Sequence, residues 1–222
     1  MTNTATTPGR ALPRIVIVGG GFAGVECAQV LLKRARGRCE VVLFNRDNHM
    51  VFVPLLPDVA GSSLNPRAVA PPLRALLPGA RCRTEEVLSI DPATRRVVFE
   101  GHDGAPRELG YDHLVLACGS VVNLNLLPGM ASHALPLKTI GDAIAMRAHV
   151  MQMLEKADVA ETEPQRRFYL SFIVVGGGFS GVEVAGELND LLRSALKRYP
   201  RIARDDVKVT LLHAQTEILP EV

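Results

Sequence analysis

The sequence predicts an α/β protein that contains two copies of one strand–turn–helix unit. Residues 14–32 read RIVIVGGGFAGVECAQVLL, and residues 172–188 read FIVVGGGFSGVEVAGEL. Each copy begins with β-branched residues, which favour a strand, and passes through glycines into an alanine- and leucine-rich stretch, which favours a helix. A second strand follows each copy, over residues 40–44 and 207–212. We therefore expect two Rossmann-like βαβ domains, the second interrupted by the end of the chain.

The glycines of the first copy have the spacing G-x-G-x-x-G. Gly19 permits a tight turn, Gly21 lets a pyrophosphate approach the backbone, and Gly24 lets the helix lie close to the strand. The free N–H groups at the helix start, with the positive end of its dipole, would face the phosphates. A tight turn without a ligand is the alternative interpretation. The second copy repeats the spacing with Gly176, Gly178 and Gly181.

The residue after the second strand of such a unit is usually an acid that binds the ribose hydroxyls. Here it is Asn45 in the first unit and His213 in the second. Asn45 can bind a hydroxyl through its amide, and His213 through one ring nitrogen. Because no arginine stands beside His213 to meet a 2′-phosphate, the sequence favours NADH and leaves NADPH open.

Composition narrows the class of protein. With 222 residues, of which 47% are hydrophobic, the chain can bury one or two cores. A net charge of +2 gives no reason to expect a nucleic-acid partner. No run approaches the ~18 apolar residues of a membrane span, and the start of the chain lacks the apolar stretch of a signal peptide. The four cysteines show no metal-binding spacing, so we expect reduced thiols and no metal, with Cys27 and Cys118 packed as small apolar residues.

Between the two units the sequence predicts a connection, a β-meander and a linker. Residues 50–59 are too proline-broken for a strand and too apolar for a surface loop, so they form either a buried connection under the sheet or a wall for a flat apolar ring. Short strands are expected over residues 86–90, 96–100 and 113–118, and helices over 66–77 and 141–158. The expected organisation is a disordered tail at 1–13, a first domain at 14–125 and an incomplete second domain at 126–222.

In content and order the sequence resembles the flavin-dependent pyridine-nucleotide oxidoreductases, most closely the type II NADH:quinone oxidoreductases. The motifs that carry this resemblance span residues 14–222 and read IVIVGGGFAGVECA, NHMVFVPLLPDVAGSSLNP, YDHLVLACGS, LPLKTIGDAIAMR and IVVGGGFSGVEVAGEL. Such enzymes bind FAD with the first glycine unit and NADH with the second. The resemblance therefore implies a flavoprotein of respiratory electron transfer, which moves a hydride from NADH to FAD and then reduces a quinone.

The resemblance also implies a role for individual residues. The FAD pyrophosphate would lie along Gly19, Gly20, Gly21, Phe22, Ala23 and Gly24, with the adenosine near Asn45, Arg46 and the backbone of Val87. The isoalloxazine would lie near Pro54, Leu55, Ala117, Cys118 and Gly119. NADH would be held by Gly176, Gly178, Phe179, Ser180, Gly181 and His213. Glu183 would be the catalytic group that tunes the nicotinamide or quinone pocket; alternatively it pairs with a cation or caps the helix start.

The chain departs from the family pattern in several places. Asn45 and His213 replace the usual acids, and Cys118 stands where a threonine is common. The later FAD motif and the segments that hold the quinone and the membrane are absent, so we expect the front part of a longer protein that meets the membrane only through its missing part. No cysteine lies between Arg46 and Ala80, which excludes a dithiol relay beside the flavin.

Two other functions stay open. One is a flavin-dependent reductase of a small redox protein, such as a ferredoxin or rubredoxin. The other is a non-catalytic dinucleotide-binding fragment. We expect a cytoplasmic protein, peripheral on the inner face of the cell membrane when full-length, with a homodimer as an open alternative.

Overall fold

The computed structural model describes residues 12–219, which form two compact units. Within the described residues, the first unit runs to Val51 and resumes over Ala70–Ser120. The second unit comprises Phe52–Val69 and the residues from Val121 onward. Of the expected disordered tail, all but the last two residues lie outside the described range.

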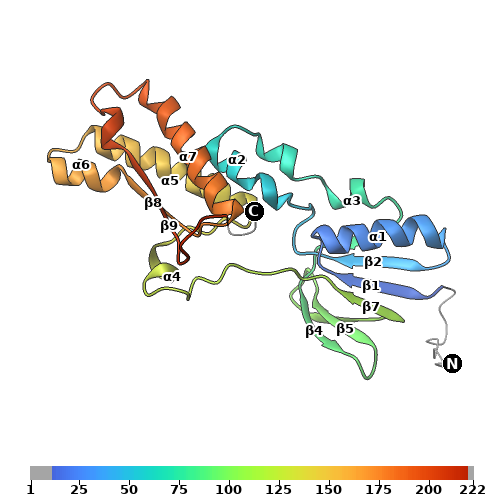
Figure 1. Ribbon diagram of the computed structural model, residues 1–222. Coiled ribbons are helices and arrows are strands. Elements are labelled where there is room, and N and C mark those ends of the chain that lie inside the picture. The colour runs from blue at the N-terminus through green and yellow to red at the C-terminus, as the bar shows by residue number, and fades with distance from the viewer. Residues whose placement is uncertain (1–11, 220–222) are drawn as a thin grey trace. The chain divides into compact units, whose positions relative to one another are not determined.

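A four-stranded parallel sheet forms the centre of the first unit, in the order β3-β2-β1-β7 (Figure 1). The strands are β1 (Arg14–Val18), β2 (Glu40–Phe44), β3 (Arg81–Arg83) and β7 (His113–Leu116). Helix α1 (Phe22–Ala35) connects β1 to β2, and the short helix α3 (Leu73–Leu76) packs beside it. The first strand–turn–helix unit of the sequence is therefore a parallel βαβ unit, as predicted.

An antiparallel meander lies on the opposite side of this sheet from α1 (Figure 1). It consists of β4 (Val87–Asp91), β5 (Arg96–Glu100) and β6 (Pro106–Gly110). Side chains of β1 and β2 alternate between the two sides: Ile17 and Leu43 pack under α1, whereas Val16, Val42 and Phe44 pack against the meander. A strand that is buried on both faces has no polar alternation, which explains the continuous apolar runs IVIV and VVLF.

The second unit is built on two parallel strands, β8 (Ser171–Val175) and β9 (Lys208–Leu212). Its longer helices are α5 (Ile140–Asp158), α6 (Glu163–Tyr169) and α7 (Phe179–Leu196). Phe172 and Val174 of β8 are buried in one core with residues of α5 and α7, such as Leu154 and Leu188. The alternate β8 residues Ile173 and Val175 are 69% and 46% exposed, so one face of this strand is apolar and open.

Short helices complete the second unit. They are η1 (Val53–Leu55), α2 (Leu56–Gly61), η2 (Pro66–Val69), α4 (Met130–His133) and η3 (Arg204–Asp206). Helix α2 packs against α5 and α7 and buries Leu56, Val59 and Ala60. Of the apolar stretch over residues 50–59, Leu56 and Val59 are therefore buried against helices, and Met50 is buried in the core beside the parallel sheet, as the first alternative expected. Phe52, Pro54 and Leu55 are exposed.

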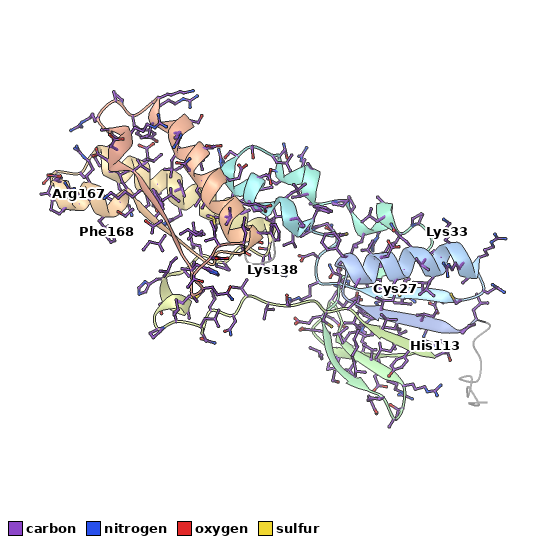
Figure 2. The ribbon with its side chains drawn as sticks, viewed as in Figure 1. Cys27, Lys33, His113, Lys138, Arg167 and Phe168 are labelled. Carbon is purple, nitrogen blue, oxygen red and sulfur yellow. The ribbon has the colours of Figure 1, made fainter. Side chains whose placement is uncertain are left out.

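Most expected elements are present, and three expectations were wrong. One helix over residues 66–77 was expected, but Pro71 and Pro72 separate η2 from α3, since proline cannot continue a helix. The last strand of the first unit ends at Leu116 and not at residue 118. Cys118 is exposed and not packed, because it lies beyond that strand. Cys27 does pack beside the core under α1 (Figure 2).

Candidate dinucleotide sites

The first glycine turn is closed tightly at two points. Gly19 has φ +113°, a conformation that L side chains rarely adopt, and its N–H donates to the carbonyl oxygen of Phe44 over 2.8 Å. A Cβ on Gly19 would lie 2.1 Å from the carbonyl oxygen of Ala117. A Cβ on Gly24 would lie 1.9 Å from the carbonyl oxygen of Gly19. Both positions therefore require glycine for packing alone.

The second glycine turn has the same backbone path but a more open first position, since a Cβ on Gly176 would meet no atom within 4 Å. Gly176 has φ +116°, and its N–H donates to the carbonyl oxygen of Leu212 over 2.9 Å. A Cβ on Gly181 would lie 1.9 Å from the carbonyl oxygen of Gly176. The two copies of the motif in the sequence are thus two copies of one turn.

The third glycine of each run has a different purpose. Gly21 and Gly178 are the N-cap residues of α1 and α7, in extended conformation and with no side chain to cap the helix. Neither helix has an acid in its first turn, and a Cβ on Gly21 would meet no atom within 4 Å. Open space at an uncapped helix start, as found at Gly21, is what the approach of a phosphate requires. We call these two places the first cradle (Gly19–Gly24) and the second cradle (Gly176–Gly181).

A side chain from the neighbouring strand end holds the middle glycine of each run. Asn45 Oδ1 accepts from the N–H of Gly20 over 2.8 Å, and Asn45 Nδ2 donates to the carbonyl oxygen of Asp47 over 2.9 Å. His213 Nδ1 accepts from the N–H of Gly177 over 3.0 Å. This contact was not predicted, although the glycine between the motif glycines was a signal for it. A Cβ at either middle glycine would lie within 2.7 Å of the ring or amide carbon.

The residues expected near FAD fall into two groups. Ala117, Cys118 and Gly119 lie beside the first cradle, since Ala117 N–H donates to the carbonyl oxygen of Val18 over 2.8 Å. Arg46 is exposed, with Nη1 3.8 Å from a carboxylate oxygen of Glu86. Val87, expected to meet the adenine, begins β4 of the same unit. The second group consists of Pro54 and Leu55, which are exposed and belong to the second unit.

Glu183 lies exposed near the start of α7, beyond its first turn. Its carboxylate makes no hydrogen bond or ion pair with any residue between 12 and 219, so the structure gives no support to the alternative that it pairs with a cation or caps the helix. The next acid on this helix, Glu187, is engaged: its Oε2 accepts from Ser63 Oγ over 2.7 Å. Glu187 thereby connects the segment after α2 to α7, a role that was not predicted.

An apolar hollow of about 460 Å³ runs along the open face of β8 in the second unit. Its walls include Leu135, Met146 and Ile173, and it reaches Ser180 and Gly181 of the second cradle. The described part of the chain contains no cluster of histidine, cysteine and carboxylate side chains that could hold a metal ion. Among residues 12–219, no helix is long and apolar enough to cross a membrane.

The comparison with known proteins agrees with this geometry. A family model described as "Pyridine nucleotide-disulphide oxidoreductase" matches residues 13–222. The chain belongs to this family. The resemblance of the sequence to this family is thereby confirmed, and so is the expected α/β fold class.

Relatives within this oxidoreductase family are alternative NAD(P)H–ubiquinone oxidoreductases. The chain is 32% identical over 216 residues to the mitochondrial external enzyme B4 of Arabidopsis thaliana, covering 93% of this chain and 36% of the relative. It is 31% identical over 216 residues to the mitochondrial external alternative NADH-ubiquinone oxidoreductase of Yarrowia lipolytica, covering 93% of this chain and 37% of the relative. The chain thus spans little more than a third of these curated relatives.

Solved structures share the fold of this chain. NDH2 from Plasmodium falciparum in complex with NADH superposes with a TM-score of 0.86 at 24% identity, covering 94% of this chain and 43% of that one. The sulfide:quinone oxidoreductase from Aquifex aeolicus has a TM-score of 0.66 at 20% identity, covering 91% and 43%. At these identities the likeness concerns the fold alone.

Proposed function

We propose that the chain binds FAD in the first cradle and NADH in the second, as part of a flavoprotein oxidoreductase that passes electrons from NADH to a quinone. The observation that carries this proposal is the repeated cradle. Both copies have the glycine turn, the uncapped helix start and a middle glycine whose N–H donates to a side chain from the neighbouring strand end. The relatives are named NAD(P)H–ubiquinone or NADH–ubiquinone oxidoreductases, and these names support transfer from NADH towards a quinone.

The residues of the first cradle fit a dinucleotide. The space in front of Gly21 is empty, and the helix behind it presents a positive dipole end without a competing acid. Asn45 Oδ1, which accepts one hydrogen bond from Gly20, keeps a second lone pair for a ribose hydroxyl. FAD supplies the chemistry, since it accepts a hydride and passes on electrons; the protein supplies binding and orientation.

The cysteines support direct transfer from a flavin to the acceptor. The described thiols are free, and Cys118, the one beside the first cradle, is exposed, with Sγ 3.7 Å from the carbonyl oxygen of Val18. Burial raises the pKa of the Cys82 thiol against the opposing effect of Arg74, which leaves less of its reactive thiolate form. With no cysteine between residues 46 and 80, a dithiol relay has no residues to use.

The acceptor, the membrane contact and the assembly belong to the whole protein. We propose a quinone as acceptor because the relatives are named for ubiquinone. Membrane contact is proposed to lie outside these residues, which match only about a third of each relative. The peripheral location at the inner face of the cell membrane and the homodimer remain predictions.

An anaerobic titration tests the proposed function. The purified chain is loaded with FAD, freed of excess flavin and mixed with NADH, while the flavin absorbance is followed. We expect retained flavin and a stoichiometric loss of its oxidised absorbance. A chain that binds FAD and NADH but leaves the flavin oxidised would support the non-catalytic alternative, and a chain that binds neither would overturn the proposal. A longer form of the protein, assayed with a quinone and with a small redox protein, distinguishes the two acceptors.

A further inference from the structure

The side chain of Glu187 contacts the end of helix α2 at two places. Its Oε2 accepts from Ser63 Oγ over 2.7 Å. A Cβ on Gly61, the last residue of α2, would lie 2.1 Å from the same oxygen and 2.7 Å from the Cβ of Glu187. The Glu187 side chain therefore lies directly against a residue that has no side chain of its own. Both elements belong to the second unit, where α2 packs against α7 (Figure 1).

The Ser63 hydroxyl has two acceptors within reach but only one proton to donate. Besides Glu187, the backbone oxygen of Asp58 lies 3.1 Å from Ser63 Oγ. The carboxylate is the nearer acceptor, and hydrogen bonds to charged groups are stronger than those to neutral ones. Without Glu187, the hydroxyl would donate to Asp58 within its own segment. The bond to Glu187 therefore adds little to stability, but it fixes the end of α2 on α7.

The repeated fold does not need an acid at this place. In the first copy of the motif, Val30 stands at the position equivalent to Glu187 and is 36% exposed. Helix α1 packs on its strands without a carboxylate there. The acid is thus specific to the second copy, which is the one that the segment Phe52–Val69 joins.

The contact lies close to the proposed catalytic acid. Glu187 follows Glu183 by four residues, so the two lie one helical turn apart on the same face of α7. The end of α2 therefore lies on the face of α7 that carries Glu183. At its other end, α2 continues directly from η1, which contains Pro54 and Leu55. Fixing the end of α2 on α7 thus fixes where these two residues stand relative to the second cradle, within one unit.

We propose that Glu187 is a positioning residue for hydride transfer from NADH to the flavin. The inference rests on the proposed function and on the expected place of Pro54 and Leu55 beside the isoalloxazine. In this step NADH is oxidised to NAD⁺, and the flavin takes up the hydride with both of its electrons. The reacting atoms must come within about 3–3.5 Å, so a small shift of the flavin wall slows the reaction. Glu187 acts through Ser63 and α2, and takes no part in the chemistry.

Reduction of the bound flavin in a single turnover tests this role. The FAD-loaded chain is mixed with saturating NADH, and the loss of flavin absorbance is followed. We expect Glu187→Ala and Ser63→Ala each to slow reduction at least about fivefold. Glu187→Gln should keep most of the wild-type rate, because its amide oxygen still accepts from Ser63. The double variant Ser63→Ala/Glu187→Ala should be no slower than either single variant, since all three lack the same bond.

Two controls separate positioning from stability and from charge. FAD retention should match wild type in each variant, and the urea midpoint should shift by less than about 0.3 M, because Ser63 can donate to Asp58 instead. Asp190 is a second acid of α7; it is exposed, and its carboxylate makes no hydrogen bond or ion pair with the described residues. Asp190→Ala should therefore leave the rate unchanged.

Each other outcome contradicts a named claim. A wild-type rate in Glu187→Ala would overturn the inference, as would additive losses in the double variant or an equal loss in Glu187→Gln. Weaker NADH binding with an unchanged rate at saturation would overturn it too, because it would show a binding role. If Glu187→Ala loses FAD, the rate in Ser63→Ala decides the inference. A wild-type flavin that NADH does not reduce would overturn the proposed function and, with it, the inference.

Discussion

Gly24 and Gly21 lie three residues apart in one motif but tolerate a side chain very differently. A Cβ on Gly24 would lie 1.9 Å from a backbone oxygen, whereas a Cβ on Gly21 would meet nothing within 4 Å. We expect Gly24→Ala to lower the free energy of unfolding by about 1–3 kcal/mol, because the strand and helix must separate. Gly21→Ala is the matched control and should stay within about 0.5 kcal/mol of wild type. Urea unfolding measures both, and equal stabilities would contradict the packing role of Gly24.

The first copy of the repeated motif provides a matched control for a catalytic role of Glu183. Glu26 occupies the equivalent place in the first copy and is likewise exposed. If Glu183 faces the nicotinamide, Glu183→Gln should slow reduction of the bound flavin by NADH about tenfold or more and leave FAD affinity unchanged. Glu26→Gln should not slow it. Stopped-flow absorbance measures the rate. Parallel loss of flavin binding and rate in Glu183→Gln would count against a catalytic role.

Some residues of the candidate site could be predicted from the sequence because they belong to a local motif, whereas contacts between distant residues could not. The motif glycines could be predicted because their spacing follows from the local path of one strand and one helix. The hydrogen bond between Gly177 and His213 joins residues 36 positions apart, and only the pairing of β8 with β9 brings them together. The contact between Glu187 and Ser63 spans 124 positions and has no local signature at all.

At the level of elements, an ion pair stabilises the end of β3. Arg83 lies over the ring of Phe99, 4.2 Å from its centroid, and pairs with Glu85. Both side chains are largely buried, at 14% and 9% exposure, so the pair is screened little by solvent. The pair holds the connection from β3 towards β4, where Val87 is expected to meet the adenine.

This pair predicts an acid-dependent stability. The hydrogen bond from Arg83 lowers the pKa of Glu85 below its usual value, against the opposing effect of burial. A carboxyl whose pKa is lower in the folded chain stabilises it fully above the unfolded pKa, and this contribution is lost as the pH falls through the folded pKa. We expect Glu85→Gln to cost about 1–3 kcal/mol at neutral pH and progressively less in acid. Urea midpoints of wild type and variant across pH check this; a constant difference would contradict it.

The elements themselves were predictable where burial leaves a regular pattern. Strands β1, β2, β5 and β8 were expected nearly to the residue, because short runs of β-branched and aromatic residues mark them in the sequence. Strand β6 (Pro106–Gly110) was not named in advance, since its exposed residues carry no apolar pattern. Helix α6 (Glu163–Tyr169) was missed as well; its signals are the N-cap Thr162, which accepts from Gln165 N–H, and a proline in the first turn.

At the scale of the whole molecule, the chain is two units with one design repeated in each. The predicted division at residues 125 and 126 follows the sequence order, but Phe52–Val69 packs with the second unit. Sequence order could not reveal this, because α2 packs against α5 and α7, which lie far along the chain, and the hydrogen bond from Ser63 to Glu187 spans 124 positions. The expected assignment of FAD to one domain and NADH to the other remains a prediction of function.

One charge placed in each cradle tests the central claim, that the chain has two separate dinucleotide sites. Gly21 and Gly178 have extended backbones that aspartate adopts freely, and aspartate is a good N-cap, so Gly21→Asp and Gly178→Asp should fold normally. Each carboxylate would stand where a phosphate should lie. Calorimetry should show FAD affinity reduced at least about tenfold in Gly21→Asp alone, and NADH affinity reduced to the same extent in Gly178→Asp alone. If both variants bound both dinucleotides as wild type does, the two cradles would not be the binding sites.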